Sequence, residues 1–136
     1  MKRRALLVGM LLLTSVLAAP QGLTNTHWEL VSVKAGGVTS LAPGGLARPR
    51  VGFQRDASTI LGFGGCNAYR AGFSVENKRL RVKDIIATKV ACAHLELESK
   101  FFAVLGKASV FVATPGTLLV SSQDGDSLLF TRIRMQ

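Results

Sequence analysis

The feature that constrains this chain most is its pair of cysteines, Cys66 and Cys92, because they follow an N-terminal segment typical of exported proteins. In an oxidising compartment two cysteines without other partners form a disulfide, whereas in the cytosol such pairs more often bind a metal or take part in redox chemistry. We therefore expect a disulfide between Cys66 and Cys92. Free buried thiols are the main alternative, and a metal site and a reactive thiol are the others.

Residues 1–18 have the three parts of a signal peptide. Three basic residues, Lys2–Arg4, precede an uncharged and leucine-rich run from Ala5 to Leu17. Val16 and Ala18 suit the −3 and −1 positions of a cleavage site after Ala18. The apolar run is shorter than the ~20 residues that a membrane-spanning helix needs, so we expect cleavage and no stable membrane insertion afterwards. The predicted location is the periplasm, the cell envelope or the extracellular space.

The remaining chain has the size of one domain, which we place at 26–134 after a linker at 19–25. The formal net charge of the whole sequence is +9. The densest basic run lies at 78–83, and as a strand it would place Arg79, Arg81 and Lys83 on one face. We interpret this face as solvated, with weak attraction to an anionic envelope component as the alternative. Nucleic acid is not an expected partner, because no aromatic residues alternate with the basic ones.

Alternating apolar residues and turn signals predict an α+β domain of seven or eight short, mostly antiparallel strands with one helix. The helix is predicted at about 93–106, because Leu97, Phe101 and Leu105 form one apolar stripe and Gly106 is a natural stop. The segment Lys34–Pro49 is rich in glycine and proline, so we expect a long surface loop there. The strands are predicted at 27–33, 50–55, 59–63, 73–75, 80–86, 109–113, 118–121 and 128–133.

Five short motifs follow one another along the chain: Thr26-x-Trp28-x-Leu30, Gly65-Cys66-Asn67-x-Tyr69, Thr88-Lys89-x-x-Cys92, Glu98-x-x-Phe101-x-x-x-Leu105 and Leu128-x-Phe130. In this order they resemble the META domain, or HslJ-like, family over nearly the whole chain after the signal. The resemblance implies a small, antiparallel, β-rich, barrel-like fold with a helix, in bacterial proteins that are usually exported or lipid-anchored. It also implies a link of some members to heat shock or envelope stress, and no catalytic mechanism. Asn25 departs from the family, which usually has glycine there.

The polar residues of these motifs are candidates for a binding surface or for structural roles. Asn67 is expected to satisfy backbone groups in a tight turn, and Tyr69 to pack its ring with the hydroxyl at the rim. Thr88 and Lys89 are expected to anchor the segment before the helix, while Glu98 is either a paired carboxylate on the helix or exposed. The full set of candidate residues is Trp28, Gly65, Asn67, Tyr69, Thr88, Lys89 and Glu98, together with the disulfide Cys66–Cys92.

These observations predict a non-catalytic, exported, monomeric envelope protein, related to stress, that binds a protein or surface partner. The first alternative is an inhibitor-like binder of an envelope hydrolase that uses the predicted loop at 34–49. A thiol enzyme would need Cys66 as nucleophile, His94 as base and Asn67 to orient them. A zinc site would use Cys66, Cys92 and His94, with His27 as a fourth ligand, but the chain lacks the usual paired ligand spacing. We expect no catalytic residue, metal or cofactor.

Overall fold

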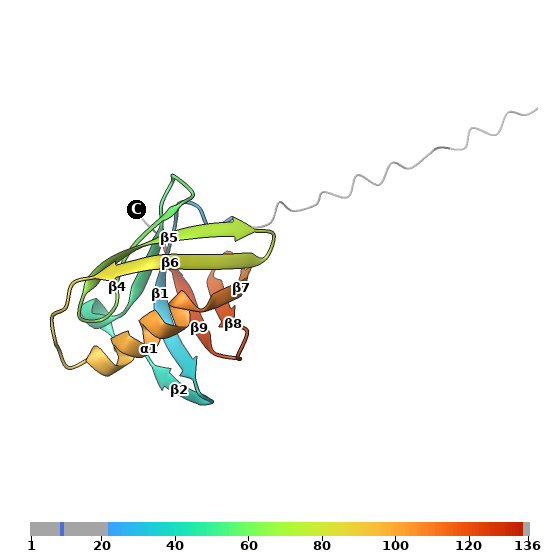
Figure 1. Ribbon diagram of the computed structural model, residues 1–136. Helices are drawn as coiled ribbons and strands as arrows, with labels where there is room; N and C mark the ends of the chain where they lie inside the picture. The colour runs from blue at the N-terminus through green and yellow to red at the C-terminus, as the bar shows by residue number, and fades with distance from the viewer. Residues whose placement is uncertain (1–8, 10–21, 135–136) are drawn as a thin grey trace, which may run out of the picture.

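The computed structural model describes residue 9 and residues 22–134, and the second range forms an antiparallel β-barrel with one helix (Figure 1). The predicted signal peptide and the linker up to residue 21 lie outside the described residues, apart from Gly9. The elements are β1 (Thr26–Ala35), β2 (Val38–Leu41), the 3-10 turn η1 (Gly45–Ala47), β3 (Arg50–Phe53), β4 (Thr59–Phe63), β5 (Ala68–Glu76), β6 (Arg79–Ala87), α1 (Leu95–Gly106), β7 (Ala108–Ala113), β8 (Thr117–Ser122) and β9 (Ser127–Ile133).

Eight of the strands close the barrel, because the first strand pairs with the last. β1 and β9 are hydrogen-bonded from the His27–Ile133 pair to the Lys34–Ser127 pair. On its other edge β1 pairs with β3 through Thr26–Glu29 and with β2 through Ser32–Ala35. β2 is thus an addition to β1 outside the closed ring. The expected antiparallel, barrel-like α+β fold is confirmed.

The prediction of one long loop at 34–49 is wrong, because much of this segment is ordered as β2 and η1. Gly36 and Gly37 have φ of +58° and +80°, the left-handed region that glycine adopts without strain. They form a two-residue hairpin turn that pairs Ala35 with Val38. The segment carries the three most exposed large apolar side chains of the described residues. These are Val38, Leu41 and Leu46, which are 63%, 78% and 85% exposed.

The core fills the barrel and is completed by α1, which packs against β1, β6, β8 and β9. Phe101 is fully buried, and its ring lies against those of Tyr69 and Phe130 at centroid distances of 5.9 and 6.3 Å. The helix begins two residues later than predicted, because His94 has non-helical backbone angles. Within the part of the chain that the structure describes, no helix has the length and apolar character needed to cross a membrane.

β6 alternates as the sequence predicted, with its basic side chains outside the barrel. Arg79, Arg81 and Lys83 are exposed, while Leu80 and Val82 are buried. A bulge interrupts the pairing with β5 where Asp84 takes a positive φ of 56°. On the other side β6 is joined to β7 by the single residue pair Arg79–Val110. Helix α1 packs against β6 in addition to this short pairing.

Lys107 follows α1 and fixes the turn between β8 and β9. Its Nζ lies 2.8 Å from Oδ2 of both Asp124 and Asp126. The hydrogen bond from Lys107, followed by one from Ser122, lowers the pKa of Asp124 to about 2. Because the pKa of Asp124 is lower in the folded than in the unfolded chain, this carboxylate stabilises the fold above its unfolded pKa. Its contribution is lost as the pH falls from about 4 to about 2.

We expect the variant Asp124→Asn to lose less stability than the wild type between pH 4 and pH 2. The asparagine does not titrate, so the proton uptake that favours the unfolded wild-type chain is absent at this position. Urea denaturation at several pH values measures the slopes. Lys107→Met removes the partner cation and should flatten the slope in the same way. Parallel curves for all three proteins would contradict this assignment.

Candidate functional site

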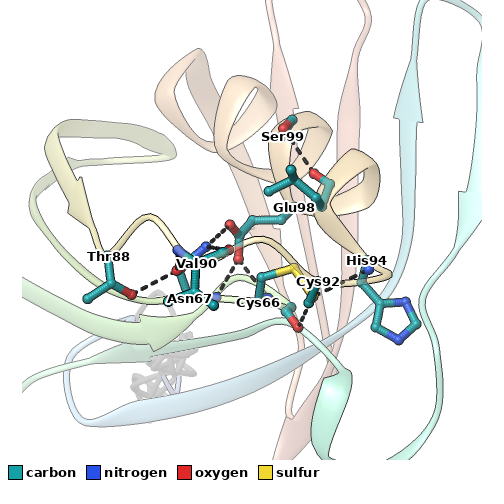
Figure 2. Close-up of a disulfide and its surroundings, with 10 residues drawn as sticks. Cys66, Asn67, Thr88, Val90, Cys92, His94, Glu98 and Ser99 are labelled. Atoms are coloured by element: carbon teal, nitrogen blue, oxygen red, sulfur yellow. Dashed lines mark hydrogen bonds between the residues drawn. A yellow bond between two sulfur atoms is a disulfide. The ribbon is translucent and has the colours of Figure 1, made fainter.

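Several of the candidate residues gather where the β4–β5 connection meets the loop between β6 and α1 (Figure 2). Glu98 extends from α1 toward Asn67 at the start of β5, and the disulfide lies beside them. Thr88 approaches Asn67 from the loop after β6. The turn before β5 is thereby tied, at one end of the barrel, to the loop after β6 and to α1, through residues 21 and 31 positions further along the chain.

Glu98 is the acceptor at the centre of this arrangement. Only 3% of the residue is exposed. Its Oε2 accepts hydrogen bonds from the backbone N–H groups of Cys66 and Asn67, both at 2.7 Å. Its Oε1 accepts a hydrogen bond of 2.6 Å from Nδ2 of Asn67. The expectation that Glu98 is exposed or a paired carboxylate on the helix is wrong, since it is a buried acceptor for the β4–β5 turn.

The amide of Asn67 uses its full hydrogen-bonding capacity within the protein. Nδ2 donates to Glu98 and, at 2.9 Å, to the carbonyl oxygen of Val90. Oδ1 accepts from the Val90 N–H at 2.6 Å and from the Thr88 hydroxyl at 2.9 Å. An amide has two donor hydrogens and two acceptor lone pairs, and all four are occupied. Asn67 therefore holds loop and turn together and has no free polar group to offer a ligand.

The disulfide joins the same two segments covalently. Cys66 and Cys92 are bonded, with their Cα atoms 5.6 Å apart. The two glycines before Cys66 let the backbone approach the helix. A Cβ on Gly64 would lie 2.8 Å from Oε2 of Glu98, and Gly65 adopts a φ of +121° that side chains rarely tolerate. Because disulfides persist in oxidising compartments, this bond indicates an extracytoplasmic location.

The other three candidate residues do not join this network. Trp28 lies in the core, and its Nε1 donates a 2.8 Å hydrogen bond to Oγ1 of Thr26. Tyr69 is buried against α1 and donates from its hydroxyl to the Arg50 carbonyl at 3.0 Å, and burial raises its pKa. Lys89 is exposed beside the network. The sequence motifs thus combine core residues with a local polar cluster.

An apolar hollow of about 640 Å³ lies directly over the polar network, and we call it the disulfide-side hollow. Asn67 and Glu98 contribute to its lining, and Thr88 and Lys89 also border it. Val90 and Leu95 line it although they are 60% and 43% exposed to solvent. Sequence reasoning did not single out these apolar residues, because a valine in a loop and a leucine at a helix start carry no distinctive pattern. Its further apolar lining is Ile85, Ala87, Ala91, Phe102 and Ala103.

The chemistry available at this end of the barrel is limited by these bonds. A thiol enzyme would need the Cys66 sulfur as a free nucleophile, but this sulfur is bonded to Cys92. Among the described residues, no group of three or more His, Cys, Asp and Glu side chains is placed to hold a metal ion. A ligand in the hollow would meet an apolar lining, and beneath it Asn67 and Glu98, whose polar atoms are already hydrogen-bonded within the protein.

The sequence model of the META domain matches residues 21–134, which covers the barrel and its helix. The chain belongs to the META domain family. No curated protein matches it. The motifs that suggested the family supply the core tryptophan, the glycine turn, the disulfide and the helix of this META domain, so they are mainly determinants of its fold.

Solved structures share the fold of this META domain at low sequence identity. A bacterial protein from Burkholderia xenovorans, solved by NMR, is 22% identical with a TM-score of 0.72, over 83% of this chain and 85% of that one. A second protein solved by NMR is 19% identical with a TM-score of 0.62, over 79% and 88% of the two chains. The crystal structure of a duf4847 family protein from Bacteroides vulgatus is 12% identical with a TM-score of 0.59, over 82% and 95%.

Proposed function

We propose that this protein is an exported, non-catalytic envelope protein that binds another protein through the disulfide-side hollow. Export is supported by the signal-like residues 1–18, with cleavage after Ala18, and by the disulfide. The destination we propose is the periplasm, the cell envelope or the extracellular space. The resemblance to HslJ-like proteins supports a role related to envelope stress, and we propose that the protein acts as a monomer.

One observation carries the binding role. Val90 and Leu95 remain exposed in a hollow whose floor is formed by Asn67 and Glu98, and the polar atoms of both floor residues are engaged in internal hydrogen bonds. Such a lining favours apolar side chains, because a polar ligand would lose water and gain no hydrogen bond from the floor. The hollow falls within the ~300–1,000 Å³ typical of ligand sites.

A photo-crosslinking residue placed at position 90 in the producing cell tests this proposal. We expect a covalent product with a partner protein, and we expect Leu95→Ser to reduce its yield because the apolar lining is lost. Position 112 is a matched control, because Val112 lies on β7 away from the hollow and is 59% exposed, close to the 60% of Val90. Equal products from positions 90 and 112 would refute the hollow as the binding surface.

An inhibitor-like binder of an envelope hydrolase is the second candidate, and the β2–η1 segment favours it. Val38, Leu41 and Leu46 project apolar side chains that the core does not use. The same crosslinking experiment with the probe at position 41 separates the two candidates. A hydrolase captured from position 41, with nothing captured from position 90, would favour the inhibitor.

A partner that the purified protein retains only at low salt would instead indicate an anionic envelope component bound by the basic face of β6.

A further inference from the structure

A second hollow lies at the end of the barrel where β1 begins and β9 ends, away from the disulfide. It has a volume of about 710 Å³ and is bordered by Arg55, Arg132, Arg134 and His27. Neither Asp nor Glu is among its described lining residues. We call it the arginine hollow, because three arginines line it and, in the described lining, no acidic residue balances their positive charge.

The strand alternation of β9 brings two of the arginines to this place. Phe130 points into the core, Arg132 follows it on the same face of β9, and Arg134 lies one residue beyond the end of this strand. Arg132 pairs opposite Trp28 in the β1–β9 register, and its guanidinium lies 5.7 Å from the centroid of the Trp28 ring. The indole is itself held by its hydrogen bond to Thr26. A cation–π contact with a fixed ring therefore positions Arg132.

The third arginine comes from a different part of the chain. Arg55 lies in the turn between β3 and β4, and its Nε donates to Oδ1 of Asn25 at 3.5 Å. Asn25 has a positive φ of 57° immediately before β1. The turn and the start of the first strand thus bring Arg55 to the same hollow as the arginines of β9.

Within the described part of the chain, the three arginines of the hollow lack the acidic partners that other basic residues of the protein have. Arg48 is paired with Glu29 at 3.2 Å, and Lys107 with two aspartates. Among the described residues, none of the three arginines of the hollow takes part in an ion pair. Cations gathered in one hollow repel each other and raise the local concentration of anions. A bound anion would relieve this repulsion.

We propose that the arginine hollow binds a phosphate group. Guanidinium groups present fixed pairs of N–H donors that match phosphate and carboxylate oxygens. Three of them around one hollow suit a tetrahedral, multiply charged group better than a planar, singly charged carboxylate. The volume exceeds that of a free phosphate, so the natural ligand is a phosphate ester, either a soluble metabolite or a lipid headgroup. This site is separate from the disulfide-side hollow and requires no partner protein.

Titration of the purified protein with inorganic phosphate, followed by amide chemical shifts in NMR spectra, tests the proposal. We expect shifts around the hollow, and binding weakened about tenfold or more by Arg55→Gln or Arg134→Gln, which each remove charge-assisted hydrogen bonds. Arg81→Gln is the matched control, since it removes the same charge from the exposed outer face of β6. This control should change the affinity for phosphate by less than about twofold, as expected for weak surface electrostatics.

Two further probes identify the source of the phosphate. Binding to phosphatidylglycerol vesicles but not to phosphatidylcholine vesicles, lost in Arg134→Gln, would support the site and assign it to a lipid headgroup. Binding of inorganic phosphate without vesicle binding would support a soluble phosphate ester. The proposal is overturned if phosphate shifts no amides near the hollow, if acetate binds as tightly as phosphate, or if Arg81→Gln weakens binding as much as Arg55→Gln.

Discussion

Replacement of Glu98 by alanine is expected to lower the free energy of unfolding by about 4 kcal/mol. The change removes three hydrogen bonds to a carboxylate and leaves the N–H groups of Cys66 and Asn67 without their acceptor. Hydrogen bonds to charged groups contribute about 1.5–3 kcal/mol each, and their effects do not add fully within one network. Since small domains unfold with roughly 5–15 kcal/mol, this single change should remove a large part of the stability.

Glu96→Ala is the matched control for this experiment. Glu96 lies on the same helix and makes a 3.3 Å ion pair with Lys100, but its side chain is exposed. Exposed pairs of this spacing contribute about 0.3–0.5 kcal/mol, so the control should unfold nearly like the wild type. Urea denaturation with a common slope gives both values. A loss below about 1 kcal/mol for Glu98→Ala would show that the carboxylate is not the anchor of the turn.

Loss of the disulfide is expected to destabilise the protein by about 3.5 kcal/mol. Cys66 and Cys92 are separated by 26 positions, and the bond restricts this loop in the unfolded chain. For a domain of this size the melting temperature should fall by roughly 10 °C or more. Thermal unfolding of the Cys66→Ala/Cys92→Ala variant, followed by circular dichroism, measures the effect.

Reductant provides the control for the disulfide. It should lower the melting temperature of the wild type to that of the double variant and should leave the double variant unchanged. The mass of the unreduced protein from its native compartment, two hydrogens below that of the reduced protein, establishes the bond independently. A wild type whose melting temperature is unchanged after thiol assays show complete reduction would contradict the stabilising role.

Local patterns were sufficient to predict the elements whose side chains alternate clearly. The exposed Arg79 and Arg81 and the buried Leu80 of β6 follow directly from a period of two. The hairpin that leads to β2 was missed, although Gly36-Gly37 is a known signal for a two-residue turn. Glycine and proline recur after it, at Pro43, Gly44, Gly45 and Pro49, and this composition is typical of an irregular loop, so it hides the short strand between the turn and Pro43.

The candidate site shows a different limit of sequence reasoning. Asn67 and Glu98 were each singled out, but their hydrogen bonds join positions 31 residues apart and depend on where α1 packs. The burial of Glu98 could not be predicted from the helix pattern, because a polar residue beside an apolar stripe normally faces water. The arginine hollow likewise depends on the β1–β9 register, which brings Arg132 over Trp28.

The pairing of β1 with β9 also determines when the protein can fold. His27 and Ile133, at the two extremes of the domain, are neighbours in the sheet. The ring can therefore close only after β9 has been synthesised and is free to pair with β1. Contacts between such distant positions also slow folding, because the loop must close before they form. Folding of this barrel is thus a late event that waits for its last strand.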